Sequence, residues 1–215
     1  IIHNAYLNKV KKLLFIAASC VYPKNSLQPI KEEYLLSGDL EPTSESYATA
    51  KIAGIKMCQA YNKQYATKFI SIVPATLYGP DDEFNLDKSH VLSAMIRKFH
   101  EAKINNQKEV ILWGTGAPRR EFLYVDDLAD ACVFIMDNDV NADLINAGSG
   151  VDISIKELAE KIKAIIGFNG EIKWDDSKPD GAKQKLLDVS RLYSLGWKHK
   201  VELEQGIKIT YQWFV

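Results

Sequence analysis

Long apolar runs and a strong net charge are both missing from this chain of 215 residues. No run approaches the roughly 20 apolar residues that a membrane-spanning helix needs. Lys9, Lys11 and Lys12 interrupt the apolar region that a signal peptide would require. The formal net charge is −1, so the chain carries no electrostatic footprint for nucleic acid or an anionic membrane. We therefore expect neither a membrane nor a nucleic-acid partner.

Cysteine is scarce as well. The 3 cysteines, Cys20, Cys58 and Cys132, lack the close spacing of metal ligands. Their odd number argues against a disulfide scaffold. We expect no metal site, and a reducing, cytoplasmic setting.

The remaining composition, 47% hydrophobic and 26% charged, is ordinary for a globular protein. Short apolar runs alternate with amphipathic stretches along the chain. Strands are expected at 11–18, 68–74, 109–113, 121–125, 143–147 and 171–174. Helices are expected at 1–10, 45–65, 90–103, 126–136, 155–166 and from 203 onwards. Such alternation is typical of an α/β fold with a mostly parallel sheet.

Polar residues mark several of the predicted helix starts. Thr43 or Ser44 is expected to cap the helix that begins at 45, and Ser89 the helix that begins at 90. Ser154 and Glu157 have the spacing of a capping box. The long helix 45–65 is expected to bury one side, made of Ala50, Ala53, Ile55, Met57, Cys58 and Tyr61.

Two loops are expected at the carboxyl ends of buried strands, at 19–23 and 75–80. In open α/β sheets the ligand crevice lies at these ends. Asp126 and Asp127 open a later helix, where their charges complement the helix macrodipole. We take that structural role as the simplest interpretation of the two acids.

Tyr47 and Lys51 are the clearest chemical pattern in the chain. Residues four apart lie on one face of a helix, one turn from each other. The charge of Lys51 would favour the phenolate of Tyr47 and lower the tyrosine pKa from its free value of about 10. Such a tyrosine can give a proton to a carbonyl oxygen during reduction. Alone, the spacing is weak evidence, because most such patterns are an ordinary tyrosine and an exposed lysine on a helix.

Five segments strengthen the pattern: A-A-S-C-V-Y-P (17–23), Y-A-T-A-K (47–51), I-V-P-A-T-L-Y-G-P (72–80), R-R-E-F-L-Y-V-D-D-L-A (119–129) and N-A-G-S-G (146–150). Together they resemble the extended short-chain dehydrogenase/reductases that act on nucleotide sugars. The resemblance implies a Rossmann-like, mostly parallel, doubly wound sheet and a smaller α/β substrate domain. Residues 1–80 and about 121–150 would belong to the first, and about 81–120 and 151–215 to the second.

Within that family the resemblance narrows to enzymes that epimerise C3 and C5 and reduce C4 of GDP-4-keto-6-deoxy-D-mannose, forming GDP-L-fucose. It implies NADP(H) as cofactor, a GDP-sugar as substrate and a homodimer. Tyr47 would be the proton donor, and Lys51 would tune it and bind the nicotinamide ribose. Cys20 and His90 match the epimerisation pair.

The resemblance also implies binding positions. Those for the cofactor are Ile16, Ala17, Ala18, Ser19, Lys51, Pro74, Ala75, Thr76, Leu77 and His90. Those for the GDP-sugar are Val91, Lys98, Trp113, Arg120 and Asp188. Plainer readings exist: a buried apolar Cys20, a capping His90, a core Trp113 and a surface Arg120.

Two departures from the family pattern stand out. The phosphate-binding G-x-x-G-x-x-G is nowhere in the sequence, so we expect about 80 to 90 further residues of such a fold ahead of this segment. Ala18 stands where the resemblance implies a catalytic serine, and losing one such donor costs about 10²- to 10³-fold in rate. A natural or engineered impairment is favoured over substitution by Ser19, because adjacent strand residues point to opposite faces.

Two other functions stay open. One is a different nucleotide-sugar epimerase or dehydratase, against which the pairing of Cys20 with His90 argues. The other is a non-catalytic nucleotide-sugar-binding homologue, which Ala18 and the missing loop would fit.

Overall fold

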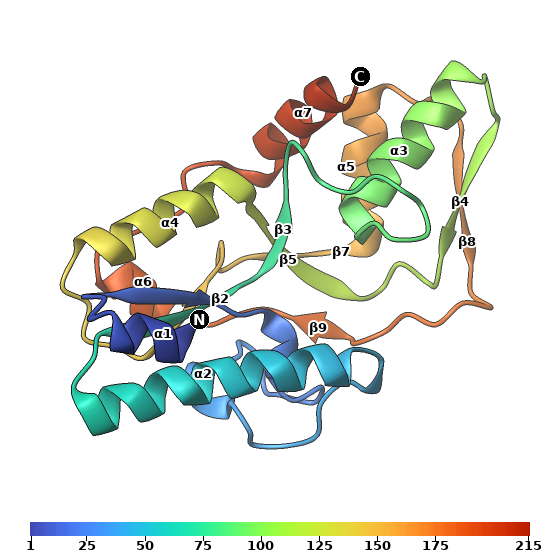
Figure 1. The fold of residues 1–215 in the computed structure, drawn as a ribbon. Helices are drawn as coiled ribbons and strands as arrows, with labels where there is room; N and C mark the ends of the chain where they lie inside the picture. Colours follow the sequence, from blue (N-terminus) through green and yellow to red (C-terminus); the bar gives the residue numbers. More distant parts are fainter.

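The computed structural model describes residues 1–215 (Figure 1). The longer helices are α1 (Ile2–Leu7), α2 (Glu45–Tyr65), α3 (Val91–Ile104), α4 (Val125–Asp137), α5 (Ile155–Ile166), α6 (Ser190–Ser194) and α7 (Leu203–Phe214). The strands are β1 (Leu13–Ile16), β2 (Phe69–Pro74), β3 (Thr76–Tyr78), β4 (Glu109–Trp113), β5 (Arg119–Tyr124), β6 (Leu144–Ala147), β7 (Asp152–Ser154), β8 (Glu171–Asp175) and β9 (Gln184–Lys185). No helix has both the length and the apolar character needed to cross a membrane.

A three-stranded parallel sheet, in the order β1-β2-β6, forms the first part of the fold. Every residue of β2 is buried, as a central strand covered on both faces requires. Helix α2 packs against β1 and β2 on one side of the sheet, while α4 contacts β1 and α6 contacts β6 (Figure 1). The predicted α/β class with a mostly parallel sheet is confirmed.

The second part contains a sheet in the order β3-β5-β7, with β9 beside β5, and the separate pair β4-β8. Helix α5 packs between α3 and α7 at the top of Figure 1. Each part has its own hydrophobic core, and β5 serves both. Leu123 belongs to the first core, whereas Phe122 and Tyr124 belong to the second.

The first core also takes residues from late in the chain, namely Leu187, Val189, Leu192 and Trp197. The chain therefore crosses between the two parts more than once. The predicted assignment of residue ranges to two domains stays a prediction.

Several local predictions are confirmed. Helix α2 begins and ends where the pattern placed it, and β4 does too. The Ser154 hydroxyl accepts the Glu157 N–H at 3.1 Å and the Glu157 carboxylate accepts the Ser154 N–H at 2.9 Å, a complete capping box.

Four local predictions are wrong. Ser44 makes no side-chain cap, because its hydroxyl points back to the Glu41 carbonyl oxygen. His90, and not Ser89, occupies the N-cap of α3. Residues 76–78 form β3 instead of continuing a loop, because β5 lies alongside to pair with them. The buried stripe of α2 is Ala48, Ile52, Ile55 and Cys58, while Ala50, Ala53 and Met57 face solvent.

Asp127 does more than complement the dipole of α4. Its side chain is 3% exposed, and its two carboxylate oxygens accept the backbone N–H groups of Lys200 and Val201, each at 3.0 Å. The neighbouring Asp126 is exposed. Asp127 therefore ties the segment ahead of α7 to the first turn of α4.

This pair of acids offers a matched test. Asp127→Asn leaves one buried N–H facing an amide NH₂, so the free energy of unfolding should fall by about 2–3 kcal/mol. Asp126→Asn loses only a dipole interaction and should change it by about 0.5 kcal/mol. Urea unfolding of both variants measures the difference. Equal effects would mean that Asp127 acts only through the helix dipole.

Candidate active site

The Lys51 amine lies at the carboxyl end of β1. Its Nζ donates a hydrogen bond of 2.8 Å to the carbonyl oxygen of Ile16, the last residue of that strand. The same nitrogen is 5.5 Å from the centre of the Tyr47 ring, one helical turn away on α2. Tyr47 is 53% exposed. The structure thus brings the two residues together at the strand ends and leaves the phenol accessible to a ligand.

A close contact between α2 and β1 produces this arrangement. Gly54 lies on the α2 surface that faces Phe15, and a Cβ added there would be 2.2 Å from the nearest Phe15 ring atom. The Phe15 ring is in turn 5.4 Å from the Lys51 nitrogen. Only a glycine lets the helix approach closely enough for Lys51 to reach the Ile16 carbonyl.

Cys20 lies in a short 3₁₀ turn, Ser19–Val21, that follows β1. Burial raises the pKa of its thiol, and the positive charges of Lys185 and Lys51 oppose this. The half-buried thiol is therefore close to two cations. The turn also removes the reason for dismissing Ser19, because Ser19 is not a strand residue and strand alternation does not set its direction.

Lys185 is the residue that sequence reasoning missed. It is aligned with Arg120 where β9 runs parallel to β5. Burial lowers the pKa of its amine, and the nearby charge of Arg120 lowers that pKa further. Burial likewise lowers the pKa of Arg120. The strand register thus holds the Arg120 and Lys185 cations side by side. No spacing in the sequence predicts this pairing, because the two residues are far apart along the chain.

Trp113 ends β4 and is 67% exposed, so it is not a core indole. The amines of Lys98 and Lys178 are each 5.7 Å from its ring centre. Lys98 also donates to the Ile111 carbonyl oxygen at 3.1 Å, and burial lowers its pKa. An exposed aromatic face with two cations beside it suits a flat, anionic ligand.

The loop that carries Lys178 is fastened to the turn after β4. The Asp180 carboxylate accepts both the N–H and the hydroxyl of Thr115, each at 2.7 Å. These bonds to Thr115 lower the pKa of Asp180. The neighbouring Gly114 has φ +77° and no space for a Cβ beside that carboxylate.

The other predicted residues are more dispersed. His90 is exposed at the start of α3, and no hydrogen bond joins it to Cys20 or Tyr47. Val91 follows it, half-buried. The Asp188 carboxylate accepts the Ser190 N–H at 2.9 Å, and hydrogen bonding to the Ser190 hydroxyl and N–H lowers the pKa of Asp188.

The predicted cofactor positions lie at neighbouring strand ends. Ile16 ends β1 and is followed by Ala17, Ala18 and Ser19, while Pro74 ends β2 and is followed by Ala75, Thr76 and Leu77. Ala75 donates its N–H to the Ala147 carbonyl oxygen at 2.8 Å, beside β6.

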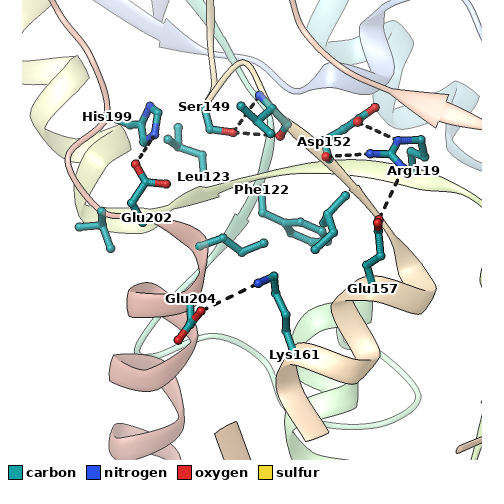
Figure 2. Close-up of a pocket in the computed structure, with 14 residues that line it drawn as sticks. Arg119, Phe122, Leu123, Ser149, Asp152, Glu157, Lys161, His199, Glu202 and Glu204 are labelled. Carbon is teal, nitrogen blue, oxygen red and sulfur yellow. Dashed lines mark hydrogen bonds and ion pairs between the residues drawn. The ribbon is translucent and has the colours of Figure 1, made fainter. Parts of the chain in front are cut away.

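A cavity of about 530 Å³ lies elsewhere, between β5, β7, α5 and the start of α7 (Figure 2). Its charged side chains are largely paired with one another, for example Arg119 with Asp152 at 2.8 Å and Lys161 with Glu204 at 3.9 Å. None of the predicted site residues lines it. We place the candidate active site at the strand ends around Lys51, because Tyr47 and Cys20 both lie near that amine.

Comparison with known proteins shows which family the chain resembles. The family model described as "NAD dependent epimerase/dehydratase family" matches residues 1–148. The chain is 56% identical over its full length to "Putative GDP-L-fucose synthase 2" of Arabidopsis thaliana, of which it covers 66%. It is 50% identical to "GDP-L-fucose synthase" of Escherichia coli (strain K12), and covers 70% of that protein. The chain thus spans about two thirds of the length of these curated relatives.

Solved structures give the same result. A GDP-L-fucose synthetase from Naegleria fowleri bound to NADP superposes with a TM-score of 0.93 at 31% identity, over 100% of this chain and 69% of that one. A GDP-6-OMe-4-keto-L-xylo-heptose reductase from C. jejuni superposes with a TM-score of 0.92 at 43% identity, over 99% of this chain and 72% of that one.

The contact between Gly54 and Phe15 predicts an inverted effect of a common stabilising change. Helix propensity alone would make Gly54→Ala stabilising by about 1 kcal/mol. The clash with Phe15 should instead make it destabilising by about 1–3 kcal/mol, measured by urea unfolding. Phe15→Leu in the same chain should recover part of the loss. A stabilised Gly54→Ala variant would show that α2 does not depend on this contact.

Proposed function

Because the chain belongs to the NAD dependent epimerase/dehydratase family, we propose that the protein converts GDP-4-keto-6-deoxy-D-mannose to GDP-L-fucose, by epimerisation at C3 and C5 and NADPH-dependent reduction at C4. The names of its relatives support this substrate. The observation that carries the chemistry is the accessible Tyr47 phenol beside a Lys51 amine fixed at the end of β1.

The residues present fit the nicotinamide end of the cofactor. Lys51 uses one of its three N–H groups on Ile16 and keeps two for a ribose hydroxyl. The residues that follow Ile16 and Pro74 lie at the carboxyl ends of the neighbouring strands β1 and β2, and we assign them to the same cofactor site. When bound, NADPH supplies a hydride for C4.

In the reduction step, Tyr47 gives its phenolic proton to the C4 oxygen, so that the ketone becomes a hydroxyl. The tyrosine is left as a phenolate, and the ammonium of Lys51 stabilises that charge. The hydrogen bond to Ile16 holds the ammonium in place throughout, so no reorganisation is needed when the charge develops.

Epimerisation uses the acidity of the C3 and C5 protons next to the C4 ketone. One residue removes such a proton and another returns one from the opposite face. We assign these roles to Cys20 and His90. Burial favours the thiol of Cys20, while the charges of Lys185 and Lys51 favour its thiolate, and a group that takes and gives protons needs both forms in turn.

The substrate end is bound by complementary charge and stacking. Trp113 presents an open face for the guanine. The adjacent cations Arg120 and Lys185 suit the diphosphate, since both are partly buried and interact more strongly with an anion than fully exposed cations would. Val91, Lys98 and Asp188 complete the proposed site.

We also infer a homodimer that works in the cytoplasm. The three cysteines are all free thiols, which supports a reducing compartment. Exposed apolar side chains on α1 and α2, among them Leu7 and Met57, support a partner on these helices. The mass in solution by analytical ultracentrifugation tests the dimer.

Loss of the Tyr47 hydroxyl should remove the proton donor. Tyr47→Phe should lower the rate of NADPH oxidation with GDP-4-keto-6-deoxy-D-mannose by about 10²- to 10⁴-fold, followed by absorbance. Tyr65→Phe, on the last turn of the same helix, should leave the rate unchanged. An unaffected Tyr47→Phe enzyme would refute this role, and no oxidation by the full-length protein carrying Ala18→Ser would refute the proposed reaction.

Ala18 and Ser19 can be separated by a reciprocal pair. If the missing hydroxyl limits the rate, Ala18→Ser should raise kcat by about 10- to 10³-fold, since it adds a donor to the C4 oxygen. If Ser19 already supplies that donor from its 3₁₀ turn, Ser19→Ala should lower kcat and Ala18→Ser should do little. Steady-state kinetics of the two variants distinguishes these cases.

A further inference from the structure

Glu121 is a buried carboxylate with no cation beside it. It lies in β5 and is 2% exposed. One oxygen accepts the Gly150 N–H at 2.7 Å, and the other accepts the Leu187 N–H at 2.8 Å. No ion pair involves it. The side chain thus bridges two segments through backbone N–H groups alone.

The protein is shaped closely around this carboxylate. A Cβ added at Gly148 would lie 2.1 Å from the nearer Glu121 oxygen. The backbone of Gly148 is not in a conformation that requires glycine. The G-S-G loop after β6 therefore has glycine at 148 to leave room for the Glu121 side chain.

The segments that Glu121 joins carry the proposed substrate residues. Arg120 precedes it in β5, and Leu187 lies between Lys185 and Asp188. From the opposite side, Ile30 holds the same segment, because its N–H donates to Leu186 at 2.7 Å and its carbonyl accepts from Asp188 at 2.8 Å. Glu121 and Ile30 therefore fix the position of Lys185 relative to Arg120.

A buried carboxylate is an expensive way to satisfy two N–H groups. Burial raises the pKa of Glu121 to about 7, against the opposing effect of its backbone hydrogen bonds. Asp152 on β7 raises it too, and Tyr193 on α6 is the other titratable group that faces it. Such a cost without a compensating ion pair is typical of a functional position.

We propose that Glu121 is a positioning residue of the substrate site, whose carboxylate sets the segment 185–188 against Arg120 so that the Lys185 and Arg120 cations converge on the nucleotide diphosphate. This inference rests on the proposed function, because that function supplies the GDP moiety. Glu121 itself touches no substrate. It acts through the backbone of Leu187.

The test uses GDP as the probe and calorimetry as the readout, so that turnover is not required. Glu121→Gln keeps the shape but turns an NH₂ towards an N–H donor, and should weaken GDP binding by about 10- to 100-fold. Glu109→Gln, which removes a carboxylate from the exposed ion pair with Lys173, should bind GDP normally. The far-ultraviolet circular dichroism of both should match that of the unmodified protein.

Gly148→Ala provides an independent route to the same end, because its methyl group would displace the carboxylate from the other side. It should also weaken GDP binding. The double variant should bind GDP no more weakly than whichever single variant binds it more weakly, since both changes break the same interaction. Additive losses would overturn the proposal. So would loss of the native fold in both single variants, which would make Glu121 a residue of general stability.

The pH dependence adds a signature that simple misfolding would not produce. Protonation makes one Glu121 oxygen a donor, so GDP affinity should fall between pH 8 and pH 6 more steeply in the unmodified protein than in Glu121→Gln. The difference between the proteins removes the titration of GDP itself. A Glu121→Gln variant that binds GDP as tightly as the unmodified protein overturns the inference and leaves the proposed function intact. If the unmodified protein shows neither GDP binding nor turnover, both the inference about Glu121 and the proposed function are refuted.

Discussion

Strand β5 has to satisfy two hydrophobic cores at once, and much of the structure follows from this constraint. Leu123 is buried in one core, and Phe122 and Tyr124 are buried in the other. The strand cannot slip by one residue without exchanging these faces. The first half of β5 therefore pairs in a fixed register with β7 and β9. This register brings Lys185 next to Arg120, although the two are far apart in the sequence.

The electrostatics of the substrate side depend on that register. Arg120 and Lys185 are held next to each other although like charges repel, and both are partly buried. The Asp180 carboxylate favours the charged form of Arg120 and offsets part of this repulsion, and a bound diphosphate would offset more of it. In the proposed site the two cations would be preorganised for the diphosphate, because the cost of bringing them together is met during folding and binding does not have to supply it.

Local pattern was enough for much of the fold. The ends of α2 match the bounds expected from its sequence pattern, and the capping box at Ser154 is a property of four consecutive residues. The failures at Ser44 and Ser89 were local, whereas β3 was missed because a distant partner decided the outcome: residues 76–78 form a strand because β5 pairs with them. The same division holds for the site. Tyr47 and Lys51 could be predicted from helical spacing. Lys185 and Glu121 could not, because strand pairing and burial single them out and no short sequence motif predicts either.

The contact of Gly54 with Phe15 has a consequence for how this protein varies through evolution. The two positions share one small volume, so the size of either side chain limits the other. A lineage can place a larger residue at 54 only after a smaller one has appeared at 15, and the reverse order passes through a displaced Lys51. Positions 15 and 54 should accordingly change in concert among relatives, and the need to keep Lys51 in place should set the order of change.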